Sequence, residues 1–385
     1  MAISRTTLIL GGGIGGLVAA NRLRQALPRE HRVVLVDREP AFVFAPSLLW
    51  LITGDRTAAK ISRPLARLEK RGVEVVRGEI ERIDPVNRTV AVDGRVLTGD
   101  HLVIALGADL APEIIPGLGE AGHNFYALAG AESLRDAFAG FSGGKLALLT
   151  AAPAYKCPAA PYEAAMLLEY ACRKRKIRGD TQLDLYAAEP GPMGVAGPDV
   201  SKAVRAMVES KGVAYHPEHQ VRDVDVRGRV LRFTNGVEAR FDLLAFIPPH
   251  RAPRVVREAG LVAESGWMQA DRHTLETKFP GVYAIGDVVA IPLKLGKPLP
   301  KAGVFAHAQA EVVARNIARA ITGKGKPASF DGEGKCWIET GDGKAGFGAG
   351  DFYAEPTPNV RIHPPARRGH ASKVLFEKHW LWRWF

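Results

Sequence analysis

Short apolar runs alternate with glycine turns and amphipathic stretches in the first part of the chain. Thr6–Leu10 is an apolar run of strand length, Leu17–Leu27 has helical character, and Arg32–Val36 is a second apolar run. Short apolar runs bounded by turn residues are typical of buried strands, so this order predicts a strand, a helix and a strand. The same order recurs between residues 145 and 187. We therefore predict an α/β fold with two Rossmann-like units.

A glycine turn follows the first of these strands. Gly11, Gly13 and Gly16 have G-x-G-x-x-G spacing, and Asp37 ends the second strand, 21 residues after Gly16. Gly11 permits the tight turn, Gly13 lets the backbone approach a pyrophosphate, and Gly16 lets helix and strand pack closely. The helix N-terminus attracts the phosphates, and a carboxylate such as Asp37 accepts hydrogen bonds from ribose hydroxyls. The turn therefore predicts a bound dinucleotide.

Two further segments indicate which dinucleotide is bound. Residues 279–287 predict a turn, a strand and an exposed pair, Gly286 and Asp287, and they resemble the second flavin-binding motif of flavoproteins with two dinucleotide folds. In those flavoproteins the aspartate holds the ribityl-pyrophosphate part of FAD. A strand that contains Ala105 and leads to Gly107 resembles the segment that returns the chain to the second unit. These segments follow one another in the order of that family, so we expect FAD.

A helix is predicted from about Gly303 to Ile321. In the flavoproteins this helix points its N-terminus at the flavin, where the positive end of the dipole stabilises negative charge on the reduced ring. Lys301 precedes the helix, and we expect it either near the flavin edge or in solvent. His307 is expected to be a packing or surface residue rather than a catalyst.

The second unit lacks a glycine turn. After its first strand the chain has three prolines and bulky side chains, and no glycine stands between Gly144 and Gly179. A pyrophosphate needs bare backbone N–H groups, so NADH is not expected to bind here. Cys157 stands in this loop beside Lys156, before a helix predicted over 164–175. A neighbouring cation and a helix start lower the pKa of a thiol, so we expect a thiolate at Cys157.

The other two cysteines have different settings. Cys336 lies among glycines beside Lys335, which predicts an exposed, cationic site. Cys172 lies within a helix and is interpreted as an inert core thiol. Glu163, six residues after Cys157, falls in the first turn of the predicted helix, where its simplest role is to favour the helix dipole.

The run from Lys156 to Glu163, with Cys336 at the matching distance downstream, resembles the sulfide:quinone oxidoreductase family. Flavocytochrome c sulfide dehydrogenase and type-2 NADH dehydrogenases are its kin. The resemblance covers nearly the whole chain and implies a glutathione-reductase-like fold. It implies that Cys157 and Cys336 form a redox-active pair, with Glu163 as the acid/base group. Sulfide would be oxidised to polysulfide or sulfane sulfur, and a membrane quinone would be the co-substrate.

Further residues follow from the same resemblance. Lys373 matches a lysine that contacts the flavin, and Phe376 matches a phenylalanine that contacts the quinone. Some family members carry a third catalytic cysteine in the stretch that here runs over 109–130, and this chain has none there. Covalent attachment of FAD in the flavocytochrome kin uses a cysteine near positions 40–50, which is also absent, so FAD is expected to be non-covalent.

These elements divide the chain into four expected segments. They are the first part of the FAD-binding domain at 1–112, a second Rossmann-like domain with a degenerate NADH loop at 113–245, the second part of the FAD-binding domain at 246–322, and a C-terminal region with an amphipathic tail at 323–385.

Composition and charge point to an anionic partner. Hydrophobic residues make up 46% of the 385 residues, which suits two medium domains, and the net charge is +11. No nucleic-acid motif is present, so an anionic membrane surface explains the charge better than DNA or RNA. The aromatic residues of the tail, with interleaved cations, are typical of a bilayer interface or of packing on the protein itself; they are Trp380, Trp382, Trp384 and Phe385.

The remaining expectations are about location and assembly. No apolar run is long enough to span a bilayer, and Met1–Thr7 carries only Arg5, which does not suit a signal peptide. We therefore expect a peripheral membrane protein anchored by its C-terminal tail. No metal site is predicted, and a homo-oligomer is compatible with the sequence.

Three other functions share parts of this pattern. A type-2 NADH:quinone dehydrogenase has the same fold and acceptor, but the missing second glycine turn and the cysteine pair argue against it. A cytochrome-linked sulfide dehydrogenase is disfavoured by the tail and by the missing signal. A non-catalytic redox binding module would have no use for a reactive cysteine pair.

Overall fold

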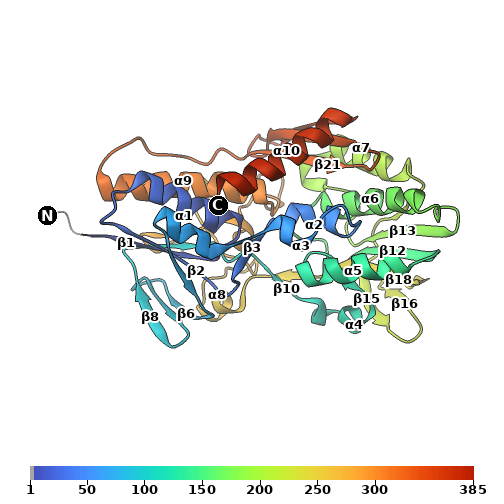
Figure 1. Ribbon diagram of the computed structural model, residues 1–385, viewed down its shortest axis with the longest axis horizontal. Coiled ribbons are helices and arrows are strands. Elements are labelled where there is room, and N and C mark those ends of the chain that lie inside the picture. The colour runs from blue at the N-terminus through green and yellow to red at the C-terminus, as the bar shows by residue number, and fades with distance from the viewer. Residues whose placement is uncertain (1–3) are drawn as a thin grey trace.

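The computed structural model describes residues 4–385 and forms two lobes side by side (Figure 1). The helix α10 (Arg367–Arg383) runs along one side of the molecule near the junction of the lobes. The expectation of no signal peptide falls partly on residues 1–3, which lie outside the described residues.

The first lobe is built on a parallel sheet with the strand order β20-β9-β1-β2-β5. The strands expected at its start are confirmed as β1 (Thr6–Leu10) and β2 (Arg32–Asp37), with α1 (Ile14–Ala26) between them. Near the other end of the chain, β20 (Val282–Ala284) pairs in parallel with β9 (His101–Ile104). The segment before Asp287 therefore returns to the first sheet after the chain has built the second lobe.

The second lobe repeats the arrangement with the strand order β11-β18-β12-β13-β14. Its first strand-helix-strand unit consists of β12 (Gly144–Thr150), α6 (Ala160–Lys174) and β13 (Thr181–Ala187). The helix begins four residues before the expected start at 164, because a proline in its first turn has the φ that a helix start requires. The expected boundary at 245 falls inside β18 (Leu243–Ile247), which belongs to this sheet, so the second unit extends to the end of that strand.

Two short strands carry the chain between the lobes. β10 (Asp109–Leu110) leaves the first lobe and β19 (His250–Arg251) returns to it, and the two pair antiparallel. The α/β fold with two Rossmann-like units is thus confirmed.

Antiparallel strands and further helices complete the lobes. The C-terminal region adds a three-stranded sheet of β21 (Glu333–Glu339), β22 (Ala345–Asp351) and β23 (Asn359–Ala366) before α10. The remaining strands are β3 (Ala41–Val43), β4 (Ser62–Pro64), β5 (Glu74–Arg77), β6 (Ile80–Asp84), β7 (Thr89–Val92), β8 (Arg95–Thr98), β11 (His123–Asn124), β14 (Ala214–His216), β15 (Val221–Asp225), β16 (Val230–Phe233) and β17 (Glu238–Arg240). The remaining α-helices are α2 (Leu48–Leu51), α3 (Ala58–Ile61), α4 (Leu118–Ala121), α5 (Leu128–Gly140), α7 (Pro198–Glu209), α8 (Arg254–Glu258) and α9 (Gly303–Thr322).

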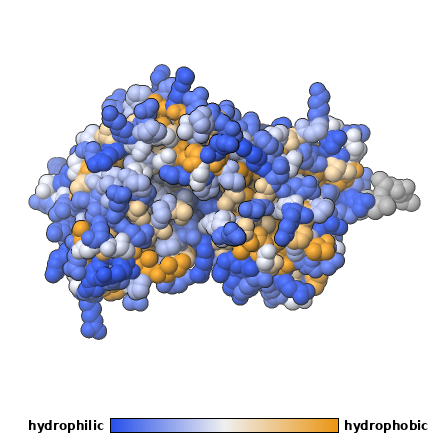
Figure 2. All heavy atoms as spheres, turned by 180° about the vertical axis from the view of Figure 1, so that it is seen from behind, coloured by the Kyte–Doolittle hydropathy of each residue, from blue (hydrophilic) through white to orange (hydrophobic). Residues whose placement is uncertain are grey.

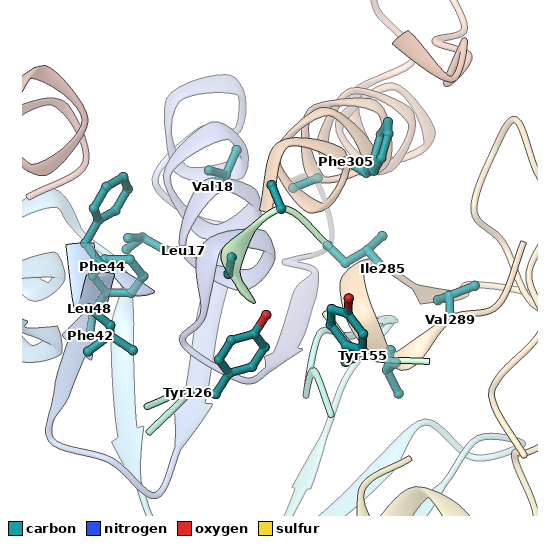
Figure 3. Packing of buried hydrophobic residues seen from close by; sticks show 14 of the residues in the cluster. Leu17, Val18, Phe42, Phe44, Leu48, Tyr126, Tyr155, Ile285, Val289 and Phe305 are labelled. Carbon is teal, nitrogen blue, oxygen red and sulfur yellow. The ribbon is translucent and has the colours of Figure 1, made fainter. Parts of the chain in front are cut away.

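One hydrophobic core joins the first sheet to its covering helices. Figure 3 shows Phe42, Phe44 and Leu48 grouped on one side of α1, with Ile285 and Phe305 on the other side. The helix expected after Gly303 is confirmed as α9, and it packs against α1. These contacts hold the glycine turn between two helices whose N-termini meet at the same edge of the sheet.

The C-terminal tail differs from the expected interfacial anchor. Trp380 and Trp384 are only 3% and 2% exposed, and Trp380 stacks on Phe42 with ring centroids 4.9 Å apart. Trp384 packs edge-on against His307 at 5.3 Å, which confirms His307 as a packing residue. Of the three tail tryptophans, Trp382 alone projects into solvent, with 74% exposure. The alternation of aromatic and charged residues therefore reflects a helix docked on its own protein.

The surface gives no sign of a continuous apolar band on the face seen in Figure 2, where apolar residues form small scattered groups among hydrophilic ones. Within residues 4–385, no helix combines the length and the apolar character that crossing a membrane demands.

Candidate active site

A cavity of about 900 Å³ lies at the carboxyl ends of the first sheet. Most of the expected cofactor residues line it: Gly11, Gly13, Asp37, Ala105, Gly107, Gly286, Asp287 and Gly303. Cys157 lines the same cavity from the second lobe. The carboxyl edge of a parallel sheet, where helix N-termini converge, is the usual place for a nucleotide in such folds.

The glycine turn has the geometry that its spacing predicts. Gly11 has a φ of +100°, which L side chains rarely adopt. A Cβ at Gly16 would overlap the carbonyl oxygen of Gly11, whereas a Cβ at Gly13 would have no protein atom within 4 Å. Gly16 is therefore required for helix-strand packing, and Gly13 leaves its space to whatever occupies the cavity.

The acidic residue after β2 is held in place by the turn itself. The Asp37 carboxylate accepts hydrogen bonds from the backbone N–H groups of Gly12 and Glu39, the latter at 2.7 Å. This fixes the carboxylate on the cavity wall, where it is positioned to accept hydrogen bonds from ribose hydroxyls.

Asp287 also suits FAD. Asp287 is partly buried rather than exposed as expected. Among the described residues its Oδ1 atom is buried without a hydrogen-bond partner. Burial raises the pKa of Asp287, and the nearby Lys156 and Lys301 ammonium groups oppose that shift. A buried acceptor of this kind fits a ligand hydroxyl, such as one on a ribityl chain.

Cys157 is held rigidly at the cavity edge. It has a φ of +51°, its N–H donates to the Lys301 carbonyl at 2.6 Å, and its own carbonyl accepts from the Tyr126 hydroxyl at 3.0 Å. Figure 3 shows the Tyr126 hydroxyl pointing toward this loop. The loop is thus fixed by backbone contacts from both lobes, and the Cys157 side chain faces the cavity.

The expected thiolate at Cys157 is wrong for the reduced protein. Burial is the main cause that raises the pKa of the Cys157 thiol, and negative charge on Cys336 and Glu163 raises it further. The expected exposed, cationic setting of Cys336 is wrong as well. Cys336 lies on β21, and burial followed by the Glu163 carboxylate raises its pKa to about 12. Both cysteines are free thiols in the structure, and each is partly buried. Charge on Cys336 acts on Cys157, so the two thiols lie near each other.

Glu163 lies beside this pair and is 2% exposed. Its Oε1 atom accepts from the Lys373 ammonium at 2.6 Å and from the Glu339 N–H at 2.9 Å. Burial lowers the pKa of Lys373, but the carboxylates of Glu163 and Glu339 outweigh this and raise it. Glu163 is therefore a buried carboxylate with a fixed partner, not a solvated residue that merely favours a helix dipole.

Three expected residues lie near the cavity without lining it: Lys301, Lys373 and Phe376. Lys301 donates to the carbonyls of Asp287 and Val289 at 2.6 and 2.9 Å, and its ammonium lies 3.5 Å from the Trp267 ring centroid. It therefore holds the loop after β20 and does not line the cavity. Lys373 also lies outside the cavity lining, at Glu163.

Phe376 is 38% exposed and stacks beside Trp337 with ring centroids 5.0 Å apart. It lies on the surface next to the β21 strand that carries Cys336, and not in the cavity.

The nucleotide position of the second lobe is filled by the protein. Glu189, which follows β13, is buried and accepts hydrogen bonds from three hydroxyls, those of Thr150, Tyr155 and Tyr162, at 2.8, 2.5 and 2.7 Å. In a dinucleotide-binding unit an acid at this place would accept from ribose hydroxyls. Here the protein's own three hydroxyls take up the Glu189 carboxylate.

Cys172 is fully buried, as expected of a core thiol.

Several residues of the site escaped sequence reasoning. Glu339 is buried, and its carboxylate lies 2.9 Å from Nδ1 of His370 on α10. Trp50 lies among these groups, 5.1 Å from the Lys373 ammonium and 5.9 Å from the His370 ring. The only signal in the sequence was an acid three residues after Cys336, which on an alternating strand gives no indication of burial.

Comparison with known proteins agrees with this fold. Residues 5–311 match the family described as pyridine nucleotide-disulphide oxidoreductase. The chain is 28% identical to the sulfide-quinone reductase of Aquifex aeolicus, over 99% of this chain and 91% of that protein. It is 24% identical to the mitochondrial sulfide:quinone oxidoreductase of Mus musculus, over 91% of this chain and 78% of the relative.

Solved structures give the same result. The crystal structure of the Aquifex aeolicus sulfide:quinone oxidoreductase matches with a TM-score of 0.89 and 26% identity, covering 99% of this chain and 91% of that chain. The resemblance that the sequence indicates is thus confirmed along the whole length.

Proposed function

Because the chain belongs to the pyridine nucleotide-disulphide oxidoreductase family, we propose that it oxidises sulfide with Cys157 and Cys336 as a redox pair and FAD and a quinone as acceptors. The single observation that carries the proposal is the position of Cys157. It lines the cavity that suits FAD, and it lies near enough to Cys336 and the buried Glu163 for their charges to raise the pKa of its thiol. The likeness to the Aquifex aeolicus and mouse proteins supports sulfide as the substrate.

The chemistry follows from thiol–disulfide exchange. In the oxidised pair, hydrosulfide attacks one sulfur of a Cys157–Cys336 disulfide; a sulfur–sulfur bond forms to the substrate, and the bond between the cysteines breaks. One cysteine becomes a persulfide and the other a thiolate. We propose that Glu163, whose charge acts on both thiols, accepts the persulfide proton. A further hydrosulfide then carries the sulfur away as polysulfide.

FAD, held without a covalent bond, supplies a two-electron acceptor between the thiol pair and the quinone. The residues that would hold it are the glycine turn, Asp37 and Asp287, with the α9 N-terminus near Gly303 facing the ring. Lys301 supports the site by fixing the loop that carries Asp287. No cysteine is available near positions 40–50 for a covalent link.

A place for the quinone is suggested by Phe376. This ring, with Trp337 and Phe347, forms an aromatic group on the outer side of the β21 strand that carries Cys336. We propose that the quinone ring stacks on this group. Electrons from the thiol pair would then reach the quinone by way of the flavin.

A basic groove supports docking on an anionic membrane. A groove of about 1090 Å³ beside α10 is lined by Arg56, Lys60, Arg63, Arg67, Arg71, Lys378 and Arg383, with the exposed Trp382. Cations beside an exposed tryptophan suit an anionic bilayer surface. We propose that the protein is peripheral and that this groove, rather than the buried tail aromatics, faces the lipid.

Anaerobic titration tests the activity. Sulfide should bleach the flavin of the purified protein, and a short-chain quinone should restore it. Flavin that stays oxidised with sulfide would refute the proposal.

Co-sedimentation with lipid vesicles tests the basic groove. Vesicles with phosphatidylglycerol should retain the protein and phosphatidylcholine vesicles should not, and Arg63→Glu with Arg67→Glu should abolish retention. Equal retention on both vesicles would contradict the groove.

A further inference from the structure

A line of titratable side chains connects the thiol pair to the surface. It begins at Glu163, which accepts a hydrogen bond from the Lys373 ammonium at 2.6 Å. It continues to Glu339, whose backbone N–H donates to the same Glu163 oxygen at 2.9 Å and whose carboxylate is near enough to Lys373 for each charge to shift the pKa of the other group. The Glu339 carboxylate lies 2.9 and 3.1 Å from Nδ1 of His370. The residues Glu163, Lys373 and Glu339 are buried, whereas the His370 side chain is 34% exposed.

These groups come from three separate elements. Glu163 lies on α6, Glu339 on β21, and Lys373 and His370 on α10, three residues apart and on one face of that helix. His370 also lines the basic groove beside α10. The line therefore runs from the space between the cysteines to solvent.

The charges of the buried part do not cancel. Two carboxylates face one ammonium, so the cluster carries one excess negative charge unless a proton is bound. Burial raises the pKa of Glu339, while Lys373 and His370 lower it and Glu163 raises it. Because a buried excess charge is costly, a proton held in the hydrogen bond between Glu339 and Nδ1 of His370 would offset it.

The other charged groups near His370 are already paired. Glu377 accepts from Ser47 at 2.5 Å and from Arg56 at 2.8 Å. The Arg56 guanidinium lies 4.6 Å from the Trp50 ring centroid, on which the His370 edge also packs. His370 is therefore the residue of this line that meets the water of the groove.

We propose that Glu163, Lys373, Glu339 and His370 form a proton relay that carries the substrate proton from the thiol pair to the groove. This inference rests on the proposed function. Oxidation of one hydrosulfide ion to sulfane sulfur releases two electrons and one proton. The electrons go to the FAD and then to the quinone. The proton leaves the persulfide for Glu163.

The outward transfer conserves the charge of each relay residue. Lys373 gives one proton to Glu339 as it accepts one from Glu163, so the ammonium is restored. Glu339 passes its proton to Nδ1 of His370, and His370 releases one from Nε2 to water in the groove. Glu163, Lys373 and Glu339 return to their starting states after one passage. His370 ends with its proton on Nδ1 instead of Nε2, so it must exchange its ring tautomer through the groove water before the next passage.

The test compares His370→Ala with His379→Ala, a matched change at an exposed histidine on the same helix. Sulfide is mixed anaerobically with the FAD-loaded proteins, and flavin reduction is followed by stopped flow. We expect reduction to slow by about tenfold or more in His370→Ala and to stay unchanged in His379→Ala. Added imidazole should restore the rate in proportion to its neutral form. An unchanged rate in His370→Ala, or a slow rate that imidazole does not rescue, would overturn the relay.

A second readout does not depend on turnover. Infrared difference spectra across a pH titration should show the C=O stretch of a protonated buried carboxyl that is lost in Glu339→Gln and changes its titration in His370→Gln. If no such band exists in the wild-type protein, or if its titration is unchanged in His370→Gln, the relay is refuted. If the wild-type flavin is not reduced by sulfide, the proposed function fails, and the infrared result still decides whether the proton is shared.

Discussion

The Lys373 ammonium donates to the Glu163 carboxylate at 2.6 Å, although the two residues lie 210 positions apart in the chain. The bond ties α10 to α6 of the second lobe, directly beside the cysteines. It makes the C-terminal helix part of the site rather than an appendage of it.

Removal of one partner of this pair should strongly destabilise the protein. Lys373→Met leaves the buried Glu163 and Glu339 carboxylates without their cation, and breaking a buried ion pair from one side typically costs about 3–5 kcal/mol. The free energy of unfolding, measured in denaturant, should fall by that order. Lys373→Met combined with Glu163→Gln should recover part of the loss. A single variant as stable as the wild type would show that the pair is not buried in solution.

The two glycines of the turn should separate folding from cofactor binding. Gly16→Ala places a Cβ on the Gly11 carbonyl, so the soluble, folded yield and the thermal midpoint should both fall. Gly13→Ala meets no protein atom and should fold normally, yet bind FAD more weakly because its methyl group points into the cavity. Flavin released on heating measures occupancy. A Gly13→Ala protein with full flavin content would contradict the placement of the pyrophosphate.

The reduced thiols should react slowly at neutral pH. Burial raises the pKa of Cys336 to about 12 and raises that of Cys157 as well, so both are protonated near pH 7. Iodoacetamide reacts with thiolate, so the alkylation rate of the unfolded protein should level off near the ordinary thiol pKa of about 8.5. The alkylation rate of the folded protein should keep rising at higher pH. Because the folded protein favours the neutral thiols, they stabilise the fold at pH values below the thiol pKa of the unfolded chain. This stabilisation is lost as the pH rises above that value. Alkylation that levels off near pH 7 would mean that a thiolate is stabilised after all.

NADH should leave the flavin oxidised. Glu189 is saturated by the hydroxyls of Thr150, Tyr155 and Tyr162, and the loop before α6 has no glycine. An anaerobic spectrum with excess NADH should therefore match the spectrum without it, while dithionite bleaches the flavin as a control. Rapid bleaching by NADH would favour the NADH:quinone dehydrogenase alternative.

Local motifs gave the parts of the account that depend on backbone geometry. The strand, turn and helix around Gly11, Gly13 and Gly16, and the return of β20 before Asp287, could be predicted because steric rules act over short stretches of chain. The missing glycine turn drew attention to Cys157, which the structure places in the lining of the cavity. The helix at 303 was found by the same local reasoning.

Features that depend on distant contacts could not be predicted in this way. The predicted environments of Cys157 and Cys336 were wrong, because burial between the lobes raises the thiol pKa more than a neighbouring lysine lowers it. Trp380 and Trp384 carry the pattern of an interface anchor but pack on the protein itself, Trp380 on Phe42 and Trp384 on His307. Glu339 and His370 meet only when β21 and α10 dock. The family resemblance supplied Glu163 and Lys373, but not their direct bond.

The central claim is that sulfide is oxidised at Cys157 and Cys336, and single-turnover flavin reduction tests it most directly. The wild-type protein, Cys157→Ala, Cys336→Ala and the matched control Cys172→Ala are each mixed anaerobically with sulfide, and the flavin absorbance is followed. We predict that the wild type and Cys172→Ala reduce their flavin at similar rates, and that each of the other two is slower by about a hundredfold or more. Reduction at a near wild-type rate in either Cys157→Ala or Cys336→Ala would contradict the account.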